Sequence, residues 1–186
     1  MTWMQRALKW LTERLDPPRV IYDRMGISEY LSRYYLIGAP KASDGKPVFD
    51  KTGVPRPDIE WTGDRIGPVA VYLHKFHRSD EDGDPHSHPW RWSVAIILSG
   101  GYREQRLDRR TNTLRTRTML PGFVNIIRGD DYHRVDLIGS ESWSLFIAGP
   151  KASSWGFWNI EMRTHVPWRE FIARKRGQSA EEVKVS

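Results

Sequence analysis

The sequence predicts a mainly antiparallel β protein, a sandwich or barrel with an amphipathic helix before it and a short helix after it. Three observations lead to this fold class. From residue 69 on, short runs rich in β-branched and aromatic residues follow one another at regular spacing. Turn-forming segments such as SGG, LPG and RGDD separate these runs. Helical periodicity is confined to the two ends of the chain, which favours antiparallel strands over βαβ units.

The first element is a helix over residues 3–15, because the apolar residues of this segment recur at helical spacing. Asp16, Pro17 and Pro18 end the pattern. We expect this helix to dock on the core of its own protein, with a membrane surface or a partner protein as the alternatives. A second short helix is predicted from Ser28, as its N-cap, through Tyr35.

Residues 38–68 are rich in glycine and proline and predict a long irregular excursion, either a lid or an arm that wraps the core. We therefore expect residues 1–68 to pack on a barrel of residues 69–163, and residues 164–186 to add a helix and a tail, all within one domain. The closing helix begins after Pro167 with the segment WREFIARK, and the tail from Gly177 is expected to fray.

Eight strands are expected between these ends. They are residues 69–77, 92–99, 102–107, 113–119, 123–128, 132–137, 142–149 and 155–162. The acidic connection that contains Asp80, Glu81, Asp82 and Asp84 lacks the closing glutamate of a calcium loop, so we interpret it as a solvated hairpin connection.

Composition narrows the class of partner. The chain of 186 residues carries a formal net charge of +6, which favours small anionic ligands, nucleotides or nucleic acid, although a merely basic surface is the plain alternative. Six arginines lie on the segment from Arg103 to Arg117, but no nucleic-acid motif accompanies them, so nucleic acid is the less favoured partner. The N-terminal segment lacks the features of a secretory signal, and no apolar run reaches the ~20 residues of a membrane helix.

The chain contains no cysteine, which fits a cytoplasmic protein and leaves nitrogen and oxygen as the ligands for any metal. Two of its six histidines, His86 and His88, are one residue apart. In an extended segment side chains at i and i+2 share a face, so both imidazoles can point at one site. His133 follows a Gly-Asp-Asp turn and is the candidate third ligand. Three histidines predict a divalent metal centre with open positions; histidines that bind a ligand directly are the alternative.

Over residues 69–149 the sequence resembles the cupin superfamily. The first cupin motif is matched by His86, His88 and Gly100, and the second, more loosely, by Gly129 and His133. Segments such as LHKFHRSD, HPW, LSGGYRE and WGFW are similar to small bacterial and phage cupins without an assigned reaction. The resemblance implies an antiparallel double-stranded β-helix, the jelly-roll barrel of cupins.

The resemblance departs from the usual ligand set at one position. Ser93 stands where most cupins have a glutamate, which implies a three-histidine site similar to that of the thiol-dioxygenase branch. The cysteine found beside the site in that branch is absent. Glu104 could compensate as a fourth ligand from the next strand, could instead orient a histidine, or could be a surface carboxylate.

We also expect a pocket around the metal. Its candidate substrate-binding residues are His74, Trp90, Trp92, Tyr102 and Arg103, with core packing as the alternative role of His74 and the tryptophans. His77 should face away from His74, since the two are three residues apart on a strand. His165 is expected to be structural, and no catalytic residue is assigned.

The favoured function is a mononuclear non-haem iron enzyme that activates dioxygen against a small polar or anionic substrate. Zinc, nickel or manganese could occupy the same ligands, and metal-independent sugar isomerisation with His86 or His133 as the base is a further alternative. A non-catalytic cupin that captures a nucleotide-like or other anionic ligand is the competing hypothesis. A homodimer formed through the N-terminal helix is a weaker expectation.

Overall fold

The computed structural model describes residues 2–23, 28–40, 42, 44–56, 68–80, 83–152, 154–175 and 177. Its strands are β1 (Arg19–Tyr22), β2 (Glu29–Ile37), β3 (Ala70–Phe76), β4 (Trp92–Ser99), β5 (Tyr102–Asp108), β6 (Thr113–Met119), β7 (Val124–Arg128), β8 (His133–Leu137), β9 (Ser142–Ala148), β10 (Gly156–Asn159) and β11 (Thr164–Pro167). The helices are α1 (Trp3–Thr12) and α2 (Trp168–Lys175). Neither helix in this part of the chain is long and apolar enough to cross a lipid bilayer.

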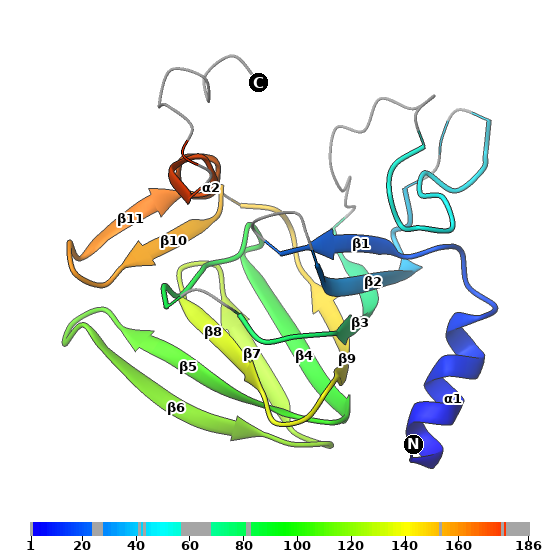
Figure 1. Cartoon of the computed structure of the whole chain (residues 1–186), viewed down its shortest axis with the longest axis horizontal. Coiled ribbons are helices and arrows are strands. Elements are labelled where there is room, and N and C mark those ends of the chain that lie inside the picture. The colour runs from blue at the N-terminus through cyan, green and yellow to red at the C-terminus, as the bar shows by residue number, and fades with distance from the viewer. Residues whose placement is uncertain are drawn as a thin grey trace.

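Two antiparallel sheets form the barrel (Figure 1). The larger has the strand order β1-β2-β3-β9-β4-β7 and the smaller the order β6-β5-β8. The segment around His86 lies beside β8 through a bridge between His86 and His133, so it extends the smaller sheet. β1 to β4 lie in the larger sheet and β5 and β6 in the smaller, after which the chain alternates between the sheets through β7, β8 and β9, as in a jelly roll. The mainly β fold class and the jelly-roll barrel expected from the sequence are therefore confirmed.

Alternation along the strands places the core between the two sheets. Along β4 the inward side chains are buried and the outward ones half-buried, as strand geometry requires. One cluster of buried residues joins the larger sheet to the site described below: Ala70, Tyr72, Trp90, Ala95, Ile127, Phe146 and Ala148. A second cluster, of Ile97, Tyr102, Met119 and Val135, closes the other end of the barrel.

The N-terminal helix docks on the outer face of the larger sheet. Thr2 and Gln5 form a capping box, in which each side chain bonds the backbone of the other, and this starts α1 at Trp3. Leu8 packs against Leu73 and Trp143 in a buried cluster. The helix therefore docks on its own protein as expected, although it ends at Thr12 and not at residue 15.

The predicted second helix is wrong. The structure has the strand β2 at Glu29–Ile37, paired with β3 from Leu31↔Phe76 to Ile37↔Val71 and with β1 on its other side. Tyrosines at 30, 34 and 35 favour a strand, and pairing on both edges outweighs the weak helical spacing of the apolar residues. The larger sheet thus begins fifty residues earlier in the chain than the strand expected at residue 69.

Part of the predicted irregular excursion is an arm on this sheet. Val48 and Phe49 are buried, and the Phe49 ring stacks on Tyr35 of β2 at 5.9 Å between centroids. The backbone N–H of Val20 in β1 donates to the carbonyl of Gly53. Residues 57–67 lie outside the described residues, as does the tail beyond Gly177. The division of the chain into 1–68, 69–163 and 164–186 stays a prediction.

The eighth predicted strand is instead a hairpin, β10–β11, because the chain reverses after Asn159. The Asn159 side chain accepts a hydrogen bond from the backbone N–H of Met162 at 2.7 Å, and Arg163 adopts a positive φ of 51°. The hairpin and α2 pack together through Phe157, Val166 and Phe171. They form a cap beside the segment that carries His86 and His88 (Figure 1).

Two glycines with positive φ allow a matched test of the turns. Gly100 has φ +74°, and a Cβ there would lie 2.2 Å from the carbonyl oxygen of Glu141; Gly122 has φ +89° and nothing within 4 Å. We expect Gly122→Ala to lose about 1–2 kcal/mol of unfolding free energy from the left-handed backbone alone. Gly100→Ala should lose about 1–3 kcal/mol more, because the methyl group collides with backbone. Urea denaturation measures both, and equal losses would contradict the collision.

Candidate metal centre

The segment with His86 and His88 is held between β8 and β10. The backbone groups of His86 and His133 exchange two hydrogen bonds, of 2.8 Å and 2.9 Å. The next N–H, of Ser87, donates to the carbonyl of Gly156 at 2.9 Å. This pairing fixes the histidine segment against the strand that supplies the third histidine. The prolines on either side favour the extended backbone that the pairing needs.

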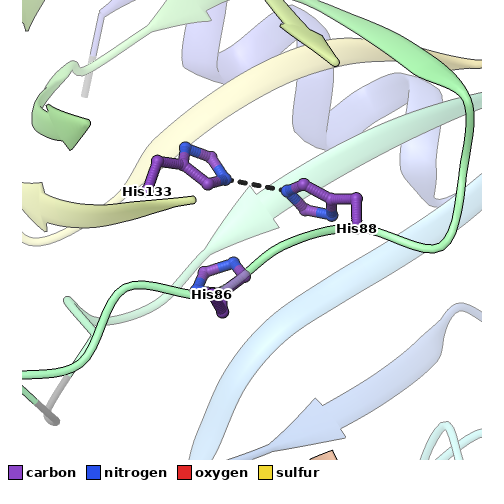
Figure 2. Close-up of side chains that lie close together, drawn as sticks. All are labelled: His86, His88 and His133. Atoms are coloured by element: carbon purple, nitrogen blue, oxygen red, sulfur yellow. Dashed lines mark hydrogen bonds between the residues drawn. The ribbon is translucent and has the colours of Figure 1, made fainter. Parts of the chain in front are cut away.

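The three predicted ligands converge. Ring centroids are 5.3 Å apart for His86 and His88, and 5.0 Å for each of the two with His133. One nitrogen atom from each ring lies within 4.8 Å of the others. Figure 2 shows the three rings arranged around one point, with the Nε2 atoms of His88 and His133 2.8 Å apart. The structure thus brings together the two segments, 45 residues apart, that the sequence singled out.

This arrangement fits a divalent metal. Two nitrogen ligands at about 2.1 Å from one ion and at right angles to each other lie about 3.0 Å apart, close to the His88–His133 separation. Imidazole nitrogen is a ligand for iron, zinc, nickel and copper alike. His133 is buried, whereas His86 and His88 are partly exposed, so solvent and small molecules have a path to the ligands. The donor set is therefore suited to an ion with open positions.

A carboxylate lies behind two of the three histidines, on the Nδ1 side of each ring. Glu104 accepts a hydrogen bond from His133 Nδ1 at 2.8 Å, and Asp80 lies 3.7 Å from His86 Nδ1. The Asp80 carboxylate also accepts a 2.7 Å hydrogen bond from the backbone N–H of Val135. In each histidine this leaves Nε2 as the atom that faces away from the carboxylate. Such an arrangement orients an imidazole toward a metal.

The environment keeps His88 neutral. Burial lowers its pKa well below the usual value, and repulsion from His133, His86, Arg33 and His74 lowers it further. The carboxyl of Glu104, in contrast, is kept in its charged form. Burial acts to raise its pKa, but hydrogen bonds and charge from His133, then Asn125 and Arg106, outweigh burial and lower the pKa to about 2. A neutral imidazole and an ionised carboxylate are the forms that metal binding requires.

Aromatic rings wall the histidines. Trp90 stacks on His88 with centroids 5.6 Å apart and a 20° interplanar angle, and Phe146 lies 6.1 Å from the same imidazole. On the side of the cap, Trp155 and Phe157 lie 6.4 Å and 6.1 Å from His86. These apolar rings lower the local dielectric beside His86 and His88, which strengthens electrostatic interactions there.

His74, a candidate substrate-binding residue, is buried deeper in the same interior. Its ring stacks on Phe146 at 4.6 Å, and its Nε2 accepts a 3.1 Å hydrogen bond from Arg33 Nε. Burial, and then the charge of Arg33, lowers the pKa of His74 well below its usual value. The Arg33 guanidinium also lies over the rings of Tyr72 and Trp90. A buried cation therefore stands in the same aromatic interior as the metal ligands.

The other candidate pocket residues are placed differently. Tyr102 is buried in the second core cluster, and burial raises its pKa to about 12. Trp92 is half-buried on the outer face of β4, where its indole lies beneath Gly149. Arg103 is exposed and neighbours Glu104 on β5, so it points to the opposite face of the smaller sheet. Of the five candidates, Trp90 and His74 are the ones the structure brings to the histidine cluster.

The remaining histidines have structural partners. His77 bonds the hydroxyl of Ser32 at 2.8 Å, and His165 bonds the hydroxyl of Tyr132 at 2.8 Å through Nδ1. His165 lies on β11 and not in a loop. In the acidic connection, Asp80 is buried and bonds β8, so the interpretation of that residue as solvated is wrong.

Four polar residues near this site were not assigned to it from the sequence: Arg33, Asp80, Asn125 and Arg106. Arg106 lies two positions after Glu104 on β5, so alternation alone would have placed both side chains on one face. Asn125 and Arg33 reach the interior from β7 and β2. Since Arg33 was assigned to a helix, its inward position could not be seen.

No protein-family model matches the chain, and no curated protein matches it in sequence. Among solved structures, oxalate oxidase in complex with the substrate analogue glycolate aligns over 63% of this chain and 61% of its own, with 15% identity and a TM-score of 0.39. Fe(II)-HppE with the alternative substrate (S)-1-HPP aligns over 73% of this chain and 56% of its own, with 7% identity and a TM-score of 0.45. KdgF from Halomonas sp. aligns over 68% and 85%, with 10% identity and a TM-score of 0.40.

The chain thus spans about three fifths of the length of oxalate oxidase and somewhat less of HppE. With TM-scores below 0.5 and identities of 15% and less, these similarities carry no conclusion about the chemistry of this chain.

Proposed function

We propose that this cupin-like barrel is a metal-dependent enzyme, a mononuclear non-haem iron dioxygenase that acts on a small polar or anionic substrate. The observation that carries the proposal is the convergence of three imidazole nitrogens within 4.8 Å, next to the aromatic rings of Trp90 and Phe146. Three neutral ligands leave a divalent ion its full charge and several adjacent open positions.

The residues that would hold the ion are His86, His88 and His133. A bound Fe(II) would supply the one-electron chemistry that dioxygen requires, whereas zinc in the same ligands has no redox chemistry and would act as a Lewis acid. The chain's own part is to bind and orient the substrate beside these ligands. Trp90 and Phe146 supply apolar surface next to His88, against which the apolar part of a substrate would pack.

An anionic substrate is supported by the charge of the interior. Arg33 is only 7% exposed, and a buried guanidinium creates a positive potential that water does not screen. Its charge is felt at His88, whose pKa it helps to lower, so it acts within reach of the metal ligands. An anion held beside the histidines would be attracted by both the ion and Arg33.

Metal content and oxygen uptake test this function. We expect the protein purified without chelators to contain about one metal ion per chain by elemental analysis, and the Fe(II)-loaded protein to consume dioxygen with a panel of small carboxylic acids. The Zn(II)-loaded protein and the Fe(II)-treated His86→Ala variant serve as controls and should consume none. A protein that contains no metal after Fe(II) loading would overturn the proposal.

Retention of metal and a small anion without any oxygen uptake would favour the alternative, a non-catalytic binding module. A homodimer and a cytoplasmic location, expected from the sequence, stay predictions.

A further inference from the structure

Glu104 is the most enclosed carboxylate near the metal ligands. It has no exposed surface, and it lies on the inward face of β5. Its Oε1 atom accepts hydrogen bonds from three donors: His133 Nδ1 at 2.8 Å, Asn125 Nδ2 at 2.8 Å and Arg106 Nη2 at 2.9 Å. A buried carboxylate costs several kcal/mol unless its charge is met by such donors. The neighbours of Glu104 are therefore arranged around an ionised group.

The donors themselves are held in place from other strands. Asn125 of β7 also accepts a 2.8 Å hydrogen bond from Arg106 Nη2, so its amide is oriented at both ends. Arg106 Nη1 reaches Asp131 at 3.3 Å and the carbonyl of Ile126 at 3.0 Å. The carboxylates of Glu104 and Asp131 and the guanidinium of Arg106 together carry one excess negative charge. This charge lies behind His133.

The contact with His133 decides which of its nitrogens is available. A carboxylate accepts a proton donor, so His133 carries its hydrogen on Nδ1 when it bonds Glu104. The lone pair is then on Nε2, the atom that lies 2.8 Å from His88 Nε2 in the cluster. Since Glu104 bonds the far side of the ring, its Oε1 cannot share the position of the three converging nitrogens.

We propose that Glu104 is the positioning residue of the metal centre: it fixes the His133 tautomer that presents Nε2 to the ion, and it supplies negative charge from behind that ligand. This proposal rests on the metal-binding function proposed above. Ser93 lies on the inward side of β4, 1% exposed, and its hydroxyl has no hydrogen-bond partner among the residues that the structure describes. The charge of Glu104 acts on the ion through the imidazole of His133, so Glu104 itself takes up no coordination position.

The first test needs no metal. In the metal-free protein at pH 8, ring ¹⁵N shifts should show His133 protonated at Nδ1 and not at Nε2. Glu104→Gln should abolish this preference, because an amide can donate as well as accept. The matched control is Glu141→Gln, since Glu141 also binds an indole N–H and a lysine but lies beside α1. A wild-type His133 protonated at Nε2 would overturn the proposal, whether or not any variant folds.

The second test measures Co(II) affinity by competition with a chelator. Glu104→Gln should weaken binding about 10–100-fold and shift the visible absorption of the Co(II) protein. Glu141→Gln should change affinity less than about 2-fold, which lies within the scatter of surface substitutions. Glu104→Asp, which keeps the charge but shortens the side chain, should fall between wild type and Glu104→Gln.

Two results of this test count against Glu104 as a positioning residue. One is unchanged affinity in Glu104→Gln; the other is loss of an oxygen ligand in the X-ray absorption of that variant, which would make Glu104 a ligand. Either leaves metal binding by the wild type intact. A wild-type protein that binds no Co(II) overturns the proposed metal function as well, so the two failures are told apart.

Discussion

His133→Ala is expected to abolish metal loading. The variant removes the ligand that comes from the smaller sheet. His86 and His88 remain, but these two ligands from one segment leave a third side of the ion without a protein ligand. We expect affinity for Co(II) or Zn(II) to fall by more than about 100-fold, beyond the effect of losing a partner that only orients a ligand. Competition with a chelator, followed by elemental analysis after gel filtration, measures it.

His165→Ala is the matched control for that variant. His165 bonds Tyr132, the residue next to His133, so its loss disturbs the same region without removing a ligand. The control should keep full metal stoichiometry. Retention of metal at full stoichiometry by His133→Ala would show that the three converging histidines are not the ligand set.

Arg106→Met should be the most destabilising single change among the charged residues near the site. The variant leaves the carboxylate of Glu104, which has no exposed surface, without its cationic partner. Removal of one member of a buried ion pair costs about 3–5 kcal/mol, and because the Arg106 side chain is 22% exposed we expect about 3 kcal/mol. The free energy of unfolding in urea measures the loss.

A double variant separates charge from packing. Glu104→Gln in the Arg106→Met background removes the uncompensated charge and should recover much of the lost stability. Arg103→Met, an exposed arginine on the same strand, should change stability by less than about 0.5 kcal/mol. If the double variant is as unstable as Arg106→Met, the loss comes from packing of the arginine and not from the buried carboxylate.

The fold class could be predicted from the sequence because its signals are local. Strands from 69 to 149 alternate inward and outward side chains and are separated by turns rich in glycine, proline and aspartate. The two histidines of the first motif are also a local signal, since alternation alone puts both on one face. His133 was a candidate because it follows a Gly-Asp-Asp turn at the start of a predicted strand, and the loose match to the second cupin motif supported it; no local pattern connects it to His88, 45 residues earlier in the chain.

The errors lie where pairing with distant strands outweighs local preference. Residues 29–37 have tyrosines and leucines at helical spacing, yet β1 and β3 pair with both of their edges and hold them extended. That strand brings Arg33 into the interior beside His74, which no pattern in the sequence could indicate. The hairpin β10–β11 was likewise hidden, because its turn depends on one asparagine side chain.

By itself, the sequence predicted a mainly β barrel, a candidate metal site without sulfur ligands, and the three histidines that the structure brings together. Only the tertiary structure decided the role of Glu104, which the sequence left open between a ligand, an orienting partner and a surface group. The physical reason is that a carboxylate's role depends on which atoms surround it in space. Here β5, β7 and β8 bring Arg106, Asn125 and His133 to one oxygen atom, on the side of the imidazole away from the other two histidines.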